Sequence, residues 1–463
     1  MKKLLILLLA GMLFPVCTHA QDRSGAWSGK LALPTGSLTL RFNLQRSDAG
    51  YTATCDSPDQ GAIGIPTESA SFRDSVLTIR IPAIHASYEG KMEKDGRIYG
   101  TFTQGIALKL TLERGEQARL KCPQEPLPPY PYQAEEVTVE NVRAGISLAG
   151  TLTLPGLGKP APAVVLVSGS GPQNRDEQIM GHKPFLVIAD YLTRRGIAVL
   201  RCDDRGVGRS KGDYSSATDA DFADDAEAAF RYLKSRKEID PKRIGIIGHS
   251  CGGTVAFMLA AKNPEVAFVV SLAGAAVRGD SLMLKQAERV MKSGGMPESA
   301  WSAMKPMLRA RYTLLTRDKS VAAIRRDLQA DIDRTLSPEQ SADPATRKQI
   351  DAQADAMTSP WYLHFMRYDP TDDLTRTMCP VFAANGDMDV QVDAGMNLAA
   401  IERRVRSNGN KRVTVKEYPG LNHLFQTSKT GAVEEYGQLE ETFSPRVLQD
   451  MTAWIVDVTG ADR

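Results

Sequence analysis

From residue 134 onward, apolar runs alternate with amphipathic segments, and this alternation constrains the fold more than any other feature of the sequence. The apolar runs are continuous rather than interleaved with polar residues, at 163–167, 197–201, 244–247, 267–272, 381–384 and 413–418. Helical patterns lie between or after them, at 184–195, 221–236, 251–262 and 445–458. Continuous apolar strands separated by helices are typical of a mostly parallel sheet covered on both faces. We therefore predict an α/β domain over 134–463, which a hairpin of strands at 137–142 and 146–154 introduces.

The strand pattern stops between 277 and 378. This stretch is helical and rich in Met, Arg and Ala, and we expect Pro297, Pro306 and Pro338 to break its helices. The sheet pattern then resumes at 381. An insertion between two sheet strands predicts a helical cap over the carboxyl edge of the strands, where open α/β sheets bind ligands.

A different pattern precedes residue 115. Leu38, Leu40, Phe42 and Leu44 alternate with polar residues, and similar period-two runs recur with turn residues between them. This pattern indicates a small all-β module over 21–121, either a barrel or a sandwich. Five prolines within residues 122–132 then predict a stiff, extended linker over 122–133, because proline fixes φ and removes a hydrogen-bond donor.

Residues 1–20 predict export. Lys2 and Lys3 precede an apolar run at 4–14, and the segment ends on the small residue Ala20. A basic start, a short apolar run and a small residue at the cleavage point are typical of a secretory signal peptide, and the run is too short for a comfortable membrane span. We expect cleavage after Ala20 and a periplasmic or secreted mature chain without a membrane span. Cys17 raises the alternative of a lipoprotein, but the residue before it is not small; an uncleaved anchor is the other alternative.

Composition excludes several function classes. The chain has 57 Lys and Arg against 55 Asp and Glu and no block of like charge, so it carries no electrostatic footprint for nucleic acid. The six histidines are scattered and no cysteine spacing resembles a metal site, so we expect neither a metal nor a cofactor. Cys55 and Cys122 are the only cysteines in the N-terminal third of the mature chain, and we predict a disulfide between them in an oxidising compartment.

Ser250 is the predicted nucleophile. It lies in Gly248-His-Ser-Cys-Gly252, a G-x-S-x-G pattern that directly follows the strand at 244–247 and opens the helix at 251–262. A strand before and a helix after are the context of a nucleophile elbow, in which the serine occupies a strained turn that only small neighbours allow. The amides and the positive dipole end at the start of the helix would then face a developing oxyanion.

A nucleophilic serine needs a general base, and the base needs an acid that orients it. His423 follows the last sheet strand, where the base of this architecture lies. His249 adjoins the serine, but the side chain of a next-door neighbour on an elbow is expected to point elsewhere. The acid should follow the strand at 381–384, where Asp387 and Asp389 are the two candidates. Asp387 directly follows a glycine, so its carboxylate is better placed to accept hydrogen bonds from turn amides.

The loop after the strand at 163–167 is rich in small residues, Ser168-Gly-Ser-Gly171. An oxyanion hole combines an amide from this loop with the amide of the residue that follows the nucleophile. We choose the amides of Ser170 and Cys251, with Gly171 as the alternative to Ser170. A phosphate-binding loop is the rival interpretation, but no Lys-Ser or Lys-Thr pair ends the motif.

Other conspicuous residues have structural interpretations. The charged stretch at 203–210 is expected to brace a loop through hydrogen bonds. Arg175 and Asp176 either touch the substrate or pair with each other. The methionines of the insertion are expected to pack in its core, although an adaptable pocket wall is the alternative.

Together these motifs resemble the α/β-hydrolase superfamily and are most similar to bacterial exported esterases related to serine aminopeptidases and acyl-peptidase-like hydrolases. The similar segments are Ser168-Gly-Ser-Gly-Pro-Gln173, Asp203-Asp-Arg-Gly-Val-Gly-Arg-Ser210, Gly248-His-Ser-Cys-Gly-Gly253, Gly386-Asp-Met-Asp389 and Gly420-Leu-Asn-His423. In that superfamily the acid stands three residues after a glycine and three before a small apolar residue, as Asp389 does, so the resemblance implies Asp389. Ser168 departs from the pattern, because many relatives have a histidine there.

The sequence therefore predicts an exported serine hydrolase that cleaves carboxylic esters through Ser250, His423 and Asp389 and an acyl-enzyme. A cap-gated serine aminopeptidase or acyl-peptidase on short peptides is the alternative among enzymes; esters are the easier chemistry, and no amine-binding glutamate pair is evident. A propeller-gated peptidase is excluded, because the N-terminal module is too short for four blades. A non-catalytic binding protein on a hydrolase scaffold is the alternative of another class, and the complete set of Ser, Asp and His argues against it.

Overall fold

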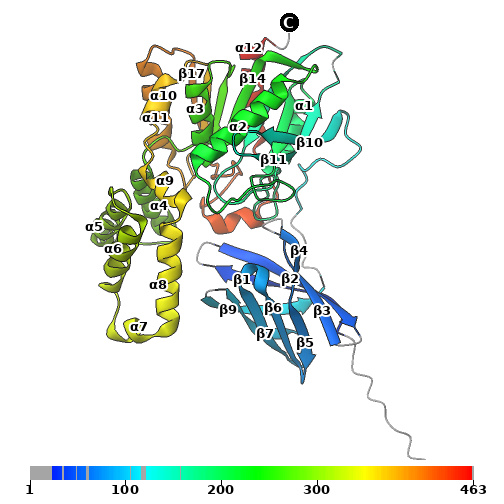
Figure 1. Cartoon of the computed structure of the whole chain (residues 1–463), viewed down its shortest axis with the longest axis vertical. Helices are drawn as coiled ribbons and strands as arrows, with labels where there is room; N and C mark the ends of the chain where they lie inside the picture. Colours follow the sequence, from blue (N-terminus) through cyan, green and yellow to red (C-terminus); the bar gives the residue numbers. More distant parts are fainter. Residues whose placement is uncertain are drawn as a thin grey trace, which may run out of the picture.

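The computed structural model describes residues 23–33, 36–47, 50–58, 62–104, 106–115, 121–156 and 158–460. The predicted signal peptide over 1–20 lies outside these residues. The described chain forms an N-terminal β barrel, an α/β domain and a helical lobe inserted into that domain (Figure 1). No helix in these ranges is both long enough and apolar enough to cross a membrane.

The N-terminal domain is an antiparallel barrel. Its sheet has the order β2-β1-β9-β8-β7-β6-β5-β3-β4, and an additional pairing between β2 and β3 closes it. Trp27, Phe42 and Tyr88 fill the interior, so the period-two pattern buries one face of each strand. The prediction of a small all-β module is confirmed. The strands are β1 (Gly25–Leu33), β2 (Gly36–Ser47), β3 (Gly50–Ser57), β4 (Ala62–Pro66), β5 (Ser69–Arg73), β6 (Val76–Ile81), β7 (Ala86–Met92), β8 (Ile98–Gln104) and β9 (Ile106–Arg114).

The predicted disulfide between Cys55 and Cys122 is wrong, since both thiols are free. Cys55 is buried in the barrel core. Cys122 lies on the α/β domain instead, where its Sγ is 3.5 Å from His182 Nδ1. The linker holds it there, because the Gln124 side chain donates to the Phe443 carbonyl (2.7 Å) and accepts from the Phe443 amide (3.0 Å).

The predicted α/β sheet is confirmed. Eight strands within the described residues have the order β10-β11-β13-β12-β14-β15-β16-β17. Strand β11 pairs antiparallel with both β10 and β13, and all the other pairs are parallel. The strands are β10 (Gln133–Asn141), β11 (Ile146–Leu154), β12 (Ala161–Val167), β13 (Ala198–Cys202), β14 (Ile239–His249), β15 (Val269–Leu272), β16 (Val381–Gly386) and β17 (Val413–Tyr418).

Helices cover both faces of this sheet. One apolar core joins the sheet to α2 (Asp219–Lys234), α3 (Cys251–Lys262), α10 (Thr371–Arg376) and α11 (Ala394–Ser407). A second core on the opposite face joins it to α1 (Pro184–Thr193) and α12 (Pro445–Thr459). Because both faces are covered, the strands are apolar on both sides, as the continuous runs in the sequence require.

The helical lobe has a core of its own, which includes Trp301, Leu315, Ile324 and Leu328, and Met283, Met291, Met296, Met304 and Met307 pack against it. Its helices are α4 (Gly279–Ser293), α5 (Glu298–Leu315), α6 (Val321–Asp333), α7 (Pro338–Ala342), α8 (Pro344–Met357) and α9 (Pro360–Arg367). Pro306 does not break a helix but lies inside α5, whose buried residues on both sides of the proline hold the two halves in line. The short α10 packs against α3 and α11, so the lobe proper ends with α9.

The loops that follow the parallel strands gather near both added units. In Figure 1 the barrel and the helical lobe project from the same side of the α/β domain. The Gln178 side chain, in the loop after β12, donates to the Pro58 carbonyl of the barrel (2.7 Å). The short helix η3 (Val433–Gln438), which follows β17, packs against β2. The carboxyl edge of the sheet is therefore bordered by the barrel and the lobe.

Candidate active site

Ser250 occupies a sharp turn between β14 and α3. Its backbone has φ +53° and ψ −120°, a conformation that non-glycine residues rarely adopt. The turn depends on close backbone contacts: a Cβ atom at Gly248 would lie 2.0 Å from the Gly252 carbonyl oxygen, and one at Gly252 would lie 2.1 Å from the Val167 carbonyl oxygen. The two glycines therefore permit the strained serine conformation, and α3 begins at the residue that follows it.

His423 and Asp389 are hydrogen-bonded to each other. His423 Nδ1 lies 2.7 Å from Asp389 Oδ2, and the carboxylate is fully buried. The other oxygen, Oδ1, accepts from the amides of Gln391 (2.7 Å) and Val392 (2.8 Å), which fix the direction of the carboxylate. Asp387 instead accepts from the amide of Gly420 (2.7 Å). The structure thus brings His423 to Asp389 and gives Asp387 a turn contact.

His249 links the His423 loop to the elbow. Its Nε2 lies 3.0 Å from the His423 carbonyl oxygen, and the two imidazole rings are 4.9 Å apart. Its Nδ1 lies 2.9 Å from Glu177 Oε1. Because His249 directly precedes Ser250, these contacts bring the three predicted triad residues to one edge of the sheet.

Side chains hold the loop after β12 against the elbow. The Gly169 amide donates to Glu177 Oε1 (2.6 Å), and the Gly171 amide donates to the Tyr214 hydroxyl (2.8 Å). A Cβ atom at Gly169 would lie 3.2 Å from the Cβ of Ser250, so this loop passes directly beside the serine. Since the Gly171 amide already has an acceptor, Ser170 is the better candidate of the two for an oxyanion hole.

Ser170 adjoins Cys251, the other predicted oxyanion residue. Burial raises the pKa of the Cys251 thiol, while hydrogen bonds from the backbone and side chain of Ser170 act in the opposite direction. Both residues line the same small cavity at the start of α3. A helix start and a neighbouring loop amide are the elements that stabilise a negatively charged oxygen.

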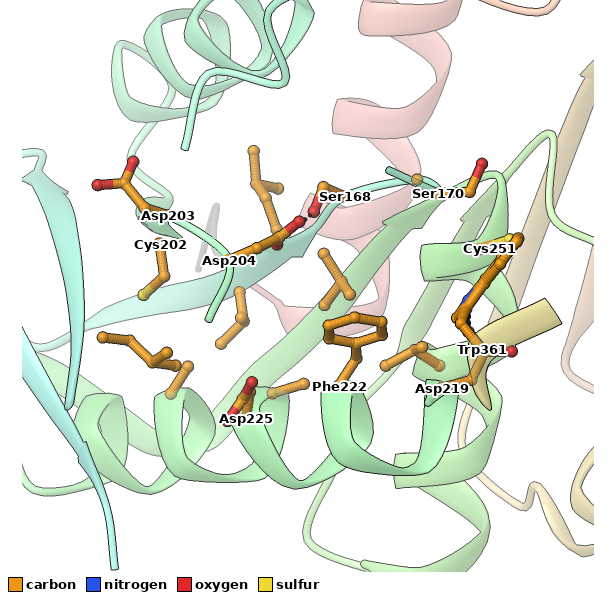
Figure 2. A pocket seen from close by; sticks show the side chains of 18 residues that line it. Ser168, Ser170, Cys202, Asp203, Asp204, Asp219, Phe222, Asp225, Cys251 and Trp361 are labelled. Carbon is orange, nitrogen blue, oxygen red and sulfur yellow. Dashed lines mark hydrogen bonds between the residues drawn. The ribbon is translucent and has the colours of Figure 1, made fainter. Parts of the chain in front are cut away.

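A cavity of about 50 Å³ lies behind these residues, and its lining includes Ser170, Cys251, Asp204 and Trp361 (Figure 2). A space of this size holds a water molecule or two rather than a substrate. Asp204 accepts from the Ser168 hydroxyl (2.8 Å) and from the Gln173 amide (2.9 Å). Desolvation raises the pKa of this carboxyl to about 7, against the opposing effect of these two donors.

The charged residues singled out in the sequence brace loops. Arg175 pairs with Asp203 (2.8 Å) and Glu136 (2.8 Å), and Asp176 pairs with Arg201, so Arg175 and Asp176 do not pair with each other. Ser168, where many relatives have a histidine, serves the Asp204 contact. Within the described ranges, no three His, Cys, Asp or Glu side chains are arranged to hold a metal ion.

Sequence reasoning missed Glu177 and Tyr214, both of which accept from amides of the loop after β12. No motif or spacing marks either residue. The sequence does show that Glu177 lies in the loop after β12 and that His249 adjoins Ser250. It does not show that their side chains point toward each other.

Residues 183–428 match the sequence profile of the serine aminopeptidase S33 family, and this segment is more than half of the 463 residues. The chain belongs to the serine aminopeptidase S33 family. The matched segment contains Ser250, Asp389 and His423. The family description is that of a serine aminopeptidase, a kind of hydrolase.

Several known proteins are similar to this S33-family chain. Esterase EstD of Thermotoga maritima is 30% identical over 176 residues, which cover 38% of this chain and 37% of EstD. Thiohydrolase apmlB of Arthrinium phaeospermum is 33% identical over 117 residues, 25% of this chain and 36% of that protein. The chain thus spans little more than a third of the length of these relatives. Among solved structures, the Pyrococcus furiosus esterase Pf2001 aligns with 15% identity and a TM-score of 0.42, over 75% of this chain and 98% of that one.

Proposed function

We propose that the protein hydrolyses carboxylic esters, with Ser250 as nucleophile, His423 as general base and Asp389 as the acid that orients it. The observation that carries this proposal is the buried 2.7 Å contact between His423 Nδ1 and Asp389 Oδ2, in a loop that His249 ties to the strained elbow. A histidine whose Nδ1–H donates to a carboxylate keeps Nε2 free of a proton, which is the tautomer that a general base needs.

In the first half of the reaction, Ser250 Oγ attacks the acyl carbon while its proton passes to His423 Nε2. The carbonyl oxygen becomes negatively charged, and the amides of Ser170 and Cys251 donate to it. The tetrahedral intermediate then collapses: the bond to the alcohol oxygen breaks, and this oxygen takes the proton from His423. The acyl group remains on Ser250 as an ester.

In the second half, a water molecule attacks the same acyl carbon and gives one proton to His423. The second tetrahedral intermediate releases Ser250, whose oxygen recovers that proton, and the carboxylic acid leaves. Asp389 stays ionised throughout and stabilises the imidazolium that forms twice in the cycle.

Two substrate classes are in competition. The similarity to the esterase EstD supports esters as substrates of this protein. The family description names an aminopeptidase, so short peptides with a free amine are the second candidate. A chain-length series of p-nitrophenyl esters, assayed beside aminoacyl-nitroanilides, separates the two. We expect ester turnover to exceed anilide turnover, and Ser250→Ala to abolish it while the fold is kept. Anilide turnover that exceeds ester turnover would overturn the ester assignment.

We also propose that the helical lobe acts as a cap on this site. Arg289 of α4 donates to the carbonyls of Asp387 (2.6 Å) and Asp389 (3.2 Å), which ties the lobe to the acid loop. Trp361 of α9, a helix that packs against α4, donates to the Asp219 carboxylate at the start of α2 (2.8 Å). Both contacts lie close to the proposed machinery, so the lobe borders the path by which a substrate would arrive.

Export remains part of the proposal. The basic, apolar and small residues of 1–20 support a cleaved signal peptide and a periplasmic or secreted enzyme. N-terminal sequencing of protein recovered from the periplasm or the medium tests this directly. We expect Gln21 as the first residue, and an intact Met1 in a cytoplasmic fraction would contradict export.

A further inference from the structure

A second histidine, His249, is held in the proposed site with a carboxylate partner of its own. The His249 and Glu177 side chains are 8% and 4% exposed, and His249 Nδ1 lies 2.9 Å from Glu177 Oε1. Glu177 Oε1 also accepts from the Gly169 amide (2.6 Å), and His249 Nε2 faces the His423 carbonyl oxygen (3.0 Å). One continuous line of hydrogen bonds therefore runs from the loop after β12, across the elbow, to the loop that carries His423.

The chemistry of the partners fixes the protonation of His249. A carboxylate oxygen and a carbonyl oxygen are acceptors, so both ring nitrogens must carry a proton if both contacts are hydrogen bonds. Burial alone would lower the pKa of His249, but the charge and the hydrogen bond of Glu177, with help from the His423 carbonyl, raise it above its usual value. The two acceptors around His249 therefore favour its imidazolium form beside Glu177. Among the described residues, the hydrogen bond of the His423 ring is the one from Nδ1 to Asp389.

The pair is kept at a cost. Glu177 has φ +49°, which is rare for a glutamate, and its Oε2 is buried without a hydrogen-bond partner among the described residues. Apolar side chains that include Phe185, Leu272 and Leu424 surround the pair. A buried charge in strained backbone is seldom neutral for stability, and strain of this kind concentrates at functional sites.

We propose that Glu177 and His249 are positioning residues that fix the oxyanion loop and the His423 loop relative to Ser250. Gly169, at one end of the line, passes beside the serine and precedes Ser170, the proposed oxyanion donor. His423, at the other end, is held by its own carbonyl. This inference rests on the proposed function, because it assigns a role to Glu177 and His249 only if Ser250, His423 and the Ser170 amide perform the reaction.

Substitutions can remove the hydrogen bond of His249 to Glu177 and its hydrogen bond to the His423 carbonyl separately. In His249→Asn the shorter amide stands near the position of Nδ1, so it can donate to Glu177 but not reach the His423 carbonyl. In His249→Gln the longer amide stands near Nε2, so it can keep the His423 contact and lose Glu177. Glu177→Gln keeps an acceptor for Gly169 but removes the charge, and a neutral His249 cannot donate to both of its partners.

The test measures kcat and KM for a p-nitrophenyl ester per active site, with sites counted by a fluorophosphonate probe. A displacement of about 1 Å in a reacting group can cost about 100-fold in rate, so we expect each single variant to lose about 10- to 100-fold in kcat with KM changed less than threefold. Glu177→Gln combined with His249→Gln should lose no more than the worse single variant, because residues that act through one line of contacts are not additive. Glu125→Gln is the matched control, since Glu125 also has a buried, unpartnered oxygen but pairs with Lys183 away from the elbow, and it should keep the wild-type kcat.

The outcomes separate the inference from the function on which it rests. If the variants lower the melting temperature but keep the wild-type kcat per labelled site, the pair is merely structural and the inference is overturned. If the double variant shows the product of the two single losses, the single line of contacts is overturned. If the wild-type protein itself shows no turnover and no labelling that Ser250→Ala removes, the proposed function fails instead.

Discussion

The loop after β17 and the end of β14 each present a histidine to the same small volume, with ring centres 4.9 Å apart. His423 has Asp389 on Nδ1, and the proposed mechanism uses its Nε2 as the base. His249 has Glu177 on Nδ1 and the His423 carbonyl on Nε2. Under this proposal the same kind of side chain serves two purposes at neighbouring positions, and the number of ring nitrogens with a hydrogen-bond partner decides which purpose each one serves. A histidine with a free nitrogen can move a proton, and one with both nitrogens occupied can only hold its neighbours in place.

The largest expected effect comes from removing His423, the proposed base. His423→Ala should lower kcat by about 10⁶-fold, because members of a triad act as a unit and loss of the base removes most of the catalysis. Steady-state ester kinetics measure the loss, with circular dichroism to confirm folding. The loss from His249→Gln should be smaller by at least three orders of magnitude. Equal losses of kcat from the two substitutions would contradict the assignment of His423 as the base and of His249 as a positioning residue.

The acids offer the next largest contrast. Asp389→Asn should cost about 10⁴-fold in kcat, because the asparagine no longer holds His423 in the reactive tautomer. Asp387→Asn should cost about tenfold at most, since the carboxylate of Asp387 accepts from the turn amide of Gly420 rather than from His423. Both substitutions replace one carboxylate oxygen by an amide nitrogen, so each variant is the control for the other. A larger loss from Asp387→Asn would reverse the assignment of the acid.

A smaller effect, on stability, concerns Asp204, which accepts a hydrogen bond from Ser168 in the loop after β12. The pKa of Asp204 is raised to about 7 in the folded protein, above the ordinary value of an aspartate. Between about pH 4 and pH 7 the unfolded chain ionises this carboxyl while the folded chain keeps the proton, so the free energy of unfolding falls as the pH rises through this window. Asp204→Asn removes this contribution, and its melting temperature should fall less than that of the wild type from pH 5 to pH 7.5. Parallel pH profiles for the two proteins would contradict the raised pKa.

Much of the α/β domain could be predicted because its pattern is local and repeated. The helix predicted at 251–262 coincides with α3, since the glycine-rich elbow before it leaves no other place for a helix to begin. The apolar run at 244–247 predicted only part of β14, which extends from Ile239 to His249. The early residues of this strand are largely polar, so the apolar pattern does not include them. Pro306 was misjudged for a related reason, because tertiary packing of α5 outweighs the lost hydrogen bond.

The contacts that the sequence could not supply are those between loops. The disulfide prediction relied on two cysteines being alone in their region, but Gln124 fastens the linker to the α/β domain and so places Cys122 beside His182. The partnership of Glu177 and His249 joins residues 72 positions apart, and no periodicity encodes the direction of either side chain. Motifs locate the loops of a site, whereas tethers between loops become visible only in three dimensions.

The most direct test of the central claim is the position of a covalent adduct. A fluorophosphonate reacts only with a serine that is activated by a base and placed beside an oxyanion hole, so it reads the elbow, His423 and the donor amides together. After labelling of the intact protein, peptide mapping by mass spectrometry should find one stoichiometric adduct on Ser250, and the Ser250→Ala protein should carry none. An adduct on a different residue, or a folded wild-type protein that remains unlabelled, would contradict the assignment of Ser250 as the nucleophile.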